Sequence, residues 1–198
     1  MSVEEDRPGF EVERSRVLLD DFFKVDEVWV RRRNQHGELS DPQRSLSLER
    51  GHSVAVLLHN LDTDRVILVN QFRYPTHADG GWITETVAGM LDDHEAPEHA
   101  ARREAFEETG YRLDELRHVA TFYASPGGSS ERIYLYLAEV TNASRIGAGG
   151  GLADQGEDIS LREYTPGDLA RAIATGELKD AKTLVAGLWF LGQKIGML

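Results

Sequence analysis

The sequence contains no cysteine among its 198 residues, which excludes disulfide bonds, thiolate zinc sites and cysteine nucleophiles together. It also lacks any apolar run that approaches the length of a membrane span, so no membrane partner is expected. The opening residues, MSVEEDRPGF, are acidic and contain no apolar stretch. We therefore expect no secretory signal and a cytoplasmic location.

Basic residues are scarce relative to acidic ones. The chain has 22 Lys and Arg residues against 34 Asp and Glu residues, a formal net charge of −12. Binding to DNA or RNA draws on clustered Lys and Arg, so nucleic acid is not expected as a partner. Small anionic substrates are not excluded, because divalent cations bound in an acidic site attract them.

The length suits one full-sized domain with an added N-terminal element. We predict that residues 1–45 form an N-terminal β-strand element and residues 46–198 the main domain. In the first part, apolar and polar residues alternate from Val12 to Arg32, which predicts two strands joined near Asp20 and Asp21.

The main domain mixes strand and helix signals. Two apolar runs, SVAVLLHN and RVILVNQFR, predict a buried hairpin, and further strands are predicted over WITETVAGM, Leu116 to Tyr123, Arg132 to Val140 and ISLREYT. A helix is predicted from Pro97 to Thr109, because Pro97 suits a first turn and Gly110 a C-terminal stop.

Two more helices are predicted to close the chain. The first opens with Thr165 and Pro166, a cap residue followed by a first-turn proline. The second runs from Ala181 to Ile195, with one apolar face made of Leu184, Leu188, Leu191 and Ile195.

A long polar stretch, NASRIGAGGGLADQGED, separates two of the predicted strands. It is too rich in glycine and polar groups to pack, and a loop of this length in a compact domain indicates a function. Its GAGGG run does not lie between a strand and a helix in the register of a dinucleotide-binding fold. We therefore assign the run no role as a nucleotide cradle.

Three carboxylates crowd one face of the predicted helix. Glu104, Glu107 and Glu108 stand at positions i, i+3 and i+4, so they project from the same side within one turn and repel one another. Divalent metal bound by these oxygen atoms would offset the repulsion. A solvated acidic helix face would present the same three residues.

The residues around the helix favour the metal site. Gly89, Glu95 and Arg103 precede the carboxylates, and Gly110 and the aromatic Tyr111 follow them, at spacings that resemble the Nudix box at every fixed position. Ala105 stands where the family usually has a larger aliphatic residue. The resemblance implies an α/β (α+β) fold, a Nudix α/β/α sandwich with a mixed sheet.

The resemblance also implies roles for the box residues. It assigns the binding of Mg²⁺ or Mn²⁺ to Glu104, Glu107 and Glu108, with the backbone carbonyl of Ala88 as a further ligand. It also implies that Glu95 and Arg103 pair with each other and hold the loop against the helix.

The flanking segments resemble one branch of this family, the ADP-ribose and GDP-mannose pyrophosphatases. These segments include LERGHSVAVLL, VNQFRYPT, ASPGGSSERIYLYLAEV and GELKDAKTLVAGLWFLGQ. The likeness implies metal-dependent hydrolysis of a nucleoside diphosphate sugar to a nucleoside monophosphate and a sugar phosphate. Both ADP-ribose and GDP-mannose stay open as substrates, and a Nudix-like sensor that binds nucleotide sugars without cleaving them is the alternative.

The branch resemblance extends to the assembly and to the substrate cleft. It implies a homodimer in which the N-terminal β element is swapped onto the partner. It also implies a set of substrate-binding residues: Arg73, Glu85, Ser125, Pro126, Gly127, Gly128 and Glu131. Arg73 could instead be an ordinary surface arginine at a strand end.

The general base is the least certain of the implied residues. Relatives often carry a glutamate in the long loop where this chain has Gln155, and a neutral amide cannot accept the proton. Glu157 and Asp158 are the remaining loop candidates. We take Glu157 as the first choice for the catalytic base, with Glu131 and Glu107 behind it.

Overall fold

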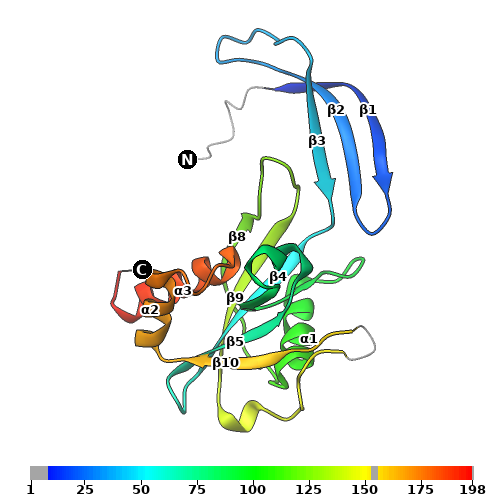
Figure 1. Ribbon diagram of the computed structural model, residues 1–198. Coiled ribbons are helices and arrows are strands. Elements are labelled where there is room, and N and C mark those ends of the chain that lie inside the picture. The colour runs from blue at the N-terminus through cyan, green and yellow to red at the C-terminus, as the bar shows by residue number, and fades with distance from the viewer. Residues whose placement is uncertain (1–8, 153–155, 198) are drawn as a thin grey trace. The chain divides into compact units, whose positions relative to one another are not determined.

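The computed structural model describes residues 9–152 and 156–197, which form two compact units (Figure 1). The N-terminal unit contains the chain up to Gly51 and also the segment Ser125–Glu131. The larger unit contains His52–Ala124 and the chain from Arg132 onward.

The N-terminal unit is a three-stranded antiparallel sheet in the order β1-β2-β3. Its strands are β1 (Phe10–Asp20), β2 (Lys24–Arg32) and β3 (Gln43–Glu49). The first two confirm the predicted pair of strands, whereas β3 was not predicted. Its sequence, QRSLSLE, has only two apolar residues, too few to signal a strand.

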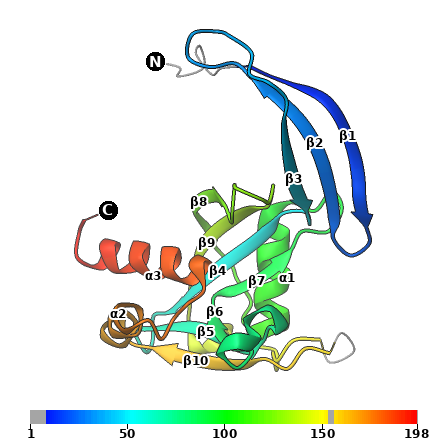
Figure 2. The ribbon, with the colours of Figure 1, turned by 45° about the horizontal axis from the view of Figure 1, so that its top comes forward.

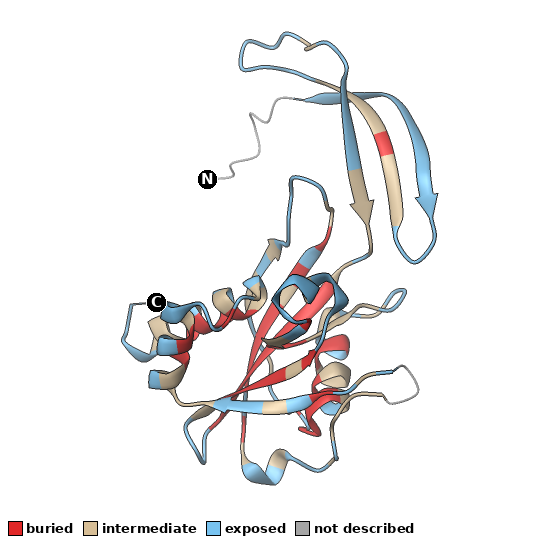
Figure 3. Cartoon of the chain, in the orientation of Figure 1, coloured by how far each residue is buried: buried red, intermediate tan, exposed pale blue. Residues whose placement is uncertain are grey.

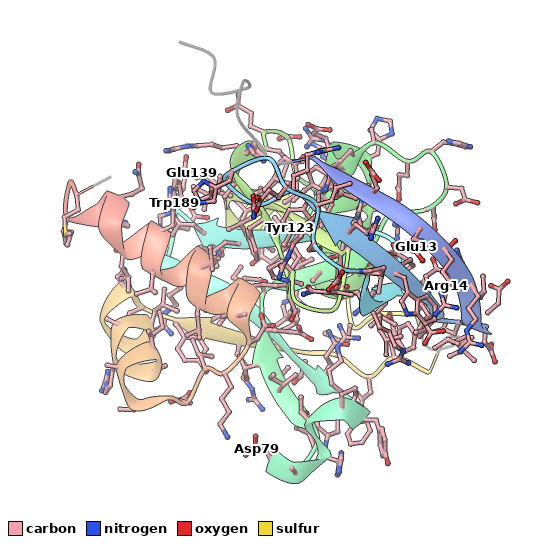
Figure 4. All side chains as sticks on the ribbon, turned by 90° about the horizontal axis from the view of Figure 1, so that it is seen from above. Glu13, Arg14, Asp79, Tyr123, Glu139 and Trp189 are labelled. Atoms are coloured by element: carbon pink, nitrogen blue, oxygen red, sulfur yellow. The ribbon has the colours of Figure 1, made fainter. Side chains whose placement is uncertain are left out.

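Charged side chains brace the middle of this sheet. The carboxylate of Glu27 on β2 is buried and accepts hydrogen bonds from Arg16 on β1 and Arg44 on β3. These hydrogen bonds lower the pKa of Glu27, Arg16 contributing most. The guanidinium of Arg14, labelled in Figure 4, lies 3.6 Å from the centre of the Trp29 ring.

Apolar side chains on the N-terminal unit are exposed to an unusual degree. Every residue of β1 is exposed (Figure 3). The exposed large apolar residues of this unit are Phe10, Val12, Val17, Leu18, Leu19, Phe22, Phe23 and Leu46. Exposed apolar side chains in this number are typical of sites of protein association.

The larger unit is built on a seven-stranded mixed sheet. The strand order is β10-β5-β4-β9-β8, with β6 paired to β5 and β7 paired to β4. Only the pair of β4 and β9 is parallel. The strands are β4 (Ser53–Asn60), β5 (Arg65–Phe72), β6 (Trp82–Glu85), β7 (Val87–Met90), β8 (Arg117–Tyr123), β9 (Arg132–Val140) and β10 (Ser160–Tyr164), and two 3₁₀ helices are η1 (Tyr74–Asp79) and η2 (Asn142–Ser144).

Helices cover both faces of this sheet. Figure 2 shows α1 (Pro97–Thr109) on one side and α2 (Pro166–Thr175) with α3 (Ala181–Lys194) on the other. Strand β4 is buried over its whole length because alternate residues serve two cores: Val54 and Val56 pack with α1, and Ala55 and Leu57 pack with α2 and α3. The predicted α/β/α sandwich with a mixed sheet is confirmed.

The segment WITETVAGM was expected to be one strand, but it breaks into β6 and β7 at Thr86. The backbone N–H of Thr86 donates to Thr183 Oγ on α3 at 2.8 Å instead of to a neighbouring strand. The break lets the segment change partner from β5 to β4. It also makes Glu85 the last residue of β6 and Val87 the first residue of β7.

The predicted apolar face of α3 is confirmed in part: Leu184 and Leu191 are half-buried against the core, whereas the other two predicted residues are exposed. Leu188 is 57% exposed and Ile195 is 70% exposed, and the buried residues are Thr183, Ala186, Gly187 and Phe190. Small residues on that face allow close packing, since a Cβ on Gly187 would lie 2.9 Å from Ile173. In residues 9–152 and 156–197, no helix combines the length and apolar character that crossing a membrane requires.

Candidate active site

Helix α1 carries the crowded carboxylates, and its sequence fixes its length. Pro97 occupies the first turn, and Gly110 ends the helix in the left-handed conformation at φ 76°, its N–H bonded to the Phe106 carbonyl. Ala101 and Ala105 are fully buried against the sheet. Ala105 stands where the family usually has a larger aliphatic residue, and its small side chain lies at a close contact between the helix and the sheet.

Glu108 is the most deeply placed of the three carboxylates. It is 3% exposed, and its Oε2 atom has no hydrogen-bond partner in the described part of the chain. Burial raises the pKa of the Glu108 carboxyl well above its usual range, and the nearby charges of Glu104 and Glu85 add to the shift. A buried carboxylate oxygen without a hydrogen-bond partner is costly, and a bound cation would supply the missing partner.

Arg103 ties the loop before the helix to the helix itself. Its Nε and Nη2 atoms donate to the two carboxylate oxygens of Glu95 at 3.1 and 2.9 Å, and Nη2 also donates to the Met90 carbonyl at 3.2 Å. Its Nη1 atom lies 2.7 Å from Glu104 Oε1 and 3.4 Å from Glu107 Oε2. The predicted pairing of Glu95 with Arg103 is confirmed.

Strand β7 passes directly against the carboxylate of Glu104. A Cβ on Gly89 would lie 1.8 Å from Glu104 Oε1, so a side chain at this position would displace that carboxylate. Ala88, whose carbonyl was predicted as a metal ligand, precedes Gly89 on the same strand.

The residues fit a divalent cation, although the cation site is not ready-made. Across residues 9–152 and 156–197, no three carboxylate or imidazole groups are drawn together as a cation site. Arg103 Nη1 binds both Glu104 and Glu107 and so already supplies a positive partner to these two carboxylates. The unpaired Glu108 Oε2 and an all-oxygen donor set suit Mg²⁺ or Mn²⁺ rather than a softer metal.

A second charge cluster surrounds Glu85, which is 3% exposed. Arg73 Nε donates to Glu85 Oε1 at 2.8 Å, and Lys182 Nζ on α3 donates to Glu85 Oε2 at 2.9 Å. Burial alone would lower the pKa of Lys182, but Glu85 and Asp180 outweigh it and raise that pKa. The carboxyls of Glu85 and Glu108 both interact with Arg73, so the two clusters form one electrostatic group.

Lys182 and Asp180 were not predicted as site residues. Both lie in the sequence KDAKT, which resembles the GDP-mannose enzymes and was the only signal available. Asp180 Oδ1 accepts from Lys182 at 2.6 Å, and Asp180 Oδ2 caps α3 through the Thr183 N–H at 2.9 Å.

Glu157 is the loop acid that the structure brings to the site. It adds to the raised pKa of Glu104 and Glu108, behind the larger effect of burial. Its Oε2 atom accepts from the Leu152 N–H at 2.8 Å, and the residue is half-buried, whereas Asp158 is exposed. Gln155 lies outside the described residues.

The remaining predicted residues belong to the N-terminal unit. These are Ser125, Pro126, Gly127, Gly128 and Glu131. The Gly128 carbonyl accepts from the Leu48 N–H at 2.8 Å, which binds this loop to β3. Glu131 is 8% exposed, with Arg50 Nη1 lying 3.6 Å from its Oε2 atom.

Comparison with known proteins places this geometry in context. The NUDIX domain family matches residues 49–185. A GDP-mannose pyrophosphatase from Enterobacter sp. (strain 638) is 36% identical over 178 residues, covering 88% of this chain and 91% of that protein. GDP-mannose pyrophosphatases from Escherichia coli O1:K1 / APEC and from Citrobacter koseri are each 37% identical over 175 residues, covering 87% of this chain and 90% of each relative.

Proposed function

The chain belongs to the Nudix hydrolase family, and we propose that it hydrolyses the diphosphate bond of a nucleoside diphosphate sugar, with GDP-mannose as the first candidate and ADP-ribose as the second. The observation that carries the proposal is the buried, unpartnered Glu108 Oε2 atom on the carboxylate face of α1, together with Arg73 and Lys182 held on the two oxygens of Glu85. The site thus offers carboxylates that could bind a metal cation and basic side chains that could bind a phosphate.

Glu104, Glu107, Glu108 and the Ala88 carbonyl are the proposed metal ligands. Bound there, Mg²⁺ or Mn²⁺ would neutralise the diphosphate and increase the acidity of a bound water. Glu157 is the proposed general base that accepts the proton of this water as it attacks phosphorus. Glu107 and Glu131 are the alternatives for that role.

The proposed substrate-binding residues are those that the family resemblance implies. Arg73 offers a planar fork for a phosphate oxygen pair, which a lysine could not match. Glu85 holds Arg73 and Lys182 in place through its two oxygen atoms. The loop residues Ser125, Pro126, Gly127 and Gly128, together with Glu131, complete the proposed set.

We further propose that the protein is a cytoplasmic homodimer with a small-molecule substrate. The support for the dimer is the exposed apolar surface of the N-terminal sheet, which a second copy would cover. In this proposal, the N-terminal β element is swapped between the two chains.

A substrate panel tests the proposal. The protein is incubated with Mg²⁺ or Mn²⁺ and with GDP-mannose, ADP-ribose, a dinucleotide or a nucleoside triphosphate, and the products are resolved by chromatography. We expect a nucleoside monophosphate and a sugar phosphate from at least one of the two nucleotide sugars. No turnover of either one with either metal would refute the proposal, and tight binding without turnover would favour a sensor.

A further inference from the structure

The long loop after η2 is docked onto the C-terminal end of α1 by backbone hydrogen bonds. The Gly150 N–H donates to the Glu108 carbonyl at 2.9 Å, and the Gly151 N–H donates to the Glu107 carbonyl at 3.0 Å. The Gly147 N–H donates to the Gly110 carbonyl at 3.0 Å. The last carbonyl groups of a helix lack partners within the helix, so the loop satisfies groups that would otherwise need water.

This docking depends on residues without a side chain. Gly149 has φ 67°, and a Cβ there would lie 2.5 Å from the carbonyl carbon and 2.8 Å from the Cα of Thr109. A Cβ on Gly110 would lie 2.2 Å from the Gly147 carbonyl oxygen. Because these neighbours are backbone atoms, they cannot move aside without shifting the helix end or the loop.

The same stretch of loop backbone holds Glu157. The Leu152 N–H donates to Glu157 Oε2 at 2.8 Å, and the Glu157 N–H donates to the Leu152 carbonyl at 3.3 Å. Leu152 directly follows Gly151, which is bonded to Glu107. The carboxylate of Glu157 is therefore connected to the backbone of Glu107 and Glu108 through consecutive hydrogen bonds.

We propose that the glycine tract, residues 147–151, is a positioning element that holds the Glu157 carboxylate in register with the carboxylates of Glu107 and Glu108, and that Gly149 is its critical residue. The inference rests on the proposed function, because it gives the tract a part in the same reaction. Gly149 touches no reacting group and acts only through Glu157.

The first test compares Gly149→Ala with Gly176→Ala. Gly176, the C-cap of α2, also has a positive φ of 73°, but a Cβ there would meet nothing within 4 Å. Both variants carry the strain of alanine at positive φ, and only Gly149→Ala carries the clash. We expect Gly149→Ala to lower kcat about 10- to 100-fold with KM within about threefold, because displaced catalytic groups cost this much, and Gly176→Ala to keep the wild-type rate. Equal rates in the two variants would overturn the proposal.

A double-mutant cycle asks whether Gly149 acts through Glu157. In a Glu157→Gln background, we expect Gly149→Ala to lower kcat by less than about threefold, because the group that it positions is already disabled. A full, multiplicative loss in that background would show that Gly149 has some other role and would overturn the inference.

A readout without turnover separates this inference from the proposed function. Amide hydrogen exchange of the metal-free protein is followed by NMR, and slow exchange is expected at Gly150 and Gly151 in the wild type. Gly149→Ala should speed exchange at these two amides by at least about tenfold, while Gly176→Ala should leave them unchanged. Unchanged exchange in Gly149→Ala would overturn the docking, whether or not the wild-type protein turns over any substrate.

Discussion

At the scale of single residues, glutamates of one motif have different roles. Glu95 pairs with Arg103 and is structural, whereas Glu108 is a proposed metal ligand. Two guanidinium nitrogens bind the two oxygens of Glu95, and the hydrogen bonds from Arg103 lower the pKa of that carboxyl. The pair joins the loop after β7 to α1 and leaves Glu108 unpaired. Substitutions at the two glutamates should therefore have different consequences.

We expect Glu95→Gln to lower the free energy of unfolding by about 1–2 kcal/mol near neutral pH, because a charged, two-point hydrogen bond is lost. Since the folded-state pKa of Glu95 lies below its ordinary value of 4.5, the stabilisation is complete above that value and is lost as the pH falls through the lowered pKa. Urea unfolding at about pH 7 and about pH 3 measures it. A difference between wild type and variant that persists at the lower pH would contradict this account.

Glu157→Gln should lower kcat by about 10²- to 10⁴-fold with a much smaller change in KM, the usual effect of removing a general base. Steady-state kinetics on the nucleotide sugar measures both constants. Glu131→Gln is the control, since Glu131 is proposed mainly to hold substrate. A near wild-type rate in Glu157→Gln with an inactive Glu131→Gln would move the base to the loop that contains Glu131.

Three of the predicted metal ligands, Glu104, Glu107 and Glu108, lie within one turn of a single helix. Their spacing and that of Arg103 are fixed, so a helix alone places them, whereas Glu95 lies in the loop before α1 and is held by Arg103. Lys182 was missed because its contact with Glu85 joins residues 97 positions apart. The close approach of Gly149 to Thr109 was missed for the same reason.

At the scale of elements, the start of α3 supports the charge cluster around Glu85. Asp180 caps the helix through Thr183 and also binds Lys182, so helix start and charge cluster share one carboxylate. Thr183 in turn accepts from Thr86, where β6 gives way to β7. The start of α3 thus fixes the break between β6 and β7.

Asp180→Ala should lower the free energy of unfolding by about 1 kcal/mol or more, because the cap is lost. Asp180→Asn is the matched control: its amide oxygen can still accept from the Thr183 N–H, so it should recover at least half of that loss. Chemical denaturation compares the two variants. Equal destabilisation by both would show that the charge, and not the cap, stabilises the helix start.

Elements with dense apolar or capping signals were predicted almost to their ends. Helix α1 and strand β9 have the predicted bounds. The break at Thr86 and the exposure of Leu188 and Ile195 were not predicted, because both depend on where a helix distant in sequence packs. Local pattern does not contain that information.

At the scale of the whole molecule, the N-terminal sheet predicts association between chains. Light scattering should give about twice the 22.1 kDa mass of one chain. Val12→Asp places a charge on an exposed apolar position of β1 and should lower the measured mass toward one chain. Its neighbour Glu13, labelled in Figure 4, gives the control Glu13→Asp, which preserves the charge. A wild-type protein that is monomeric at working concentration would refute the dimer.

The extent of the N-terminal unit could be predicted only in part. The alternating pattern of its first two strands marked it as separate, but the structure also assigns Ser125–Glu131 to it. That assignment follows from the bridge between Leu48 and Ser129, which are far apart in sequence. Composition changes along a chain cannot reveal such a connection.

The central claim is that the carboxylates of α1 form a metal-dependent site for diphosphate hydrolysis. Its most direct test follows GDP-mannose by ³¹P NMR while Mg²⁺ is added to chelator-treated protein, with Glu108→Gln in parallel. We predict that the diphosphate signals give way to two phosphomonoester signals only after Mg²⁺ is added, and at least about 10²-fold more slowly in Glu108→Gln, because the substitution removes the charge of a metal ligand. Glu108→Gln should remain folded, since the buried oxygen that it replaces has no partner in the described chain. Turnover that does not depend on metal, or an equal rate in Glu108→Gln, would contradict the account.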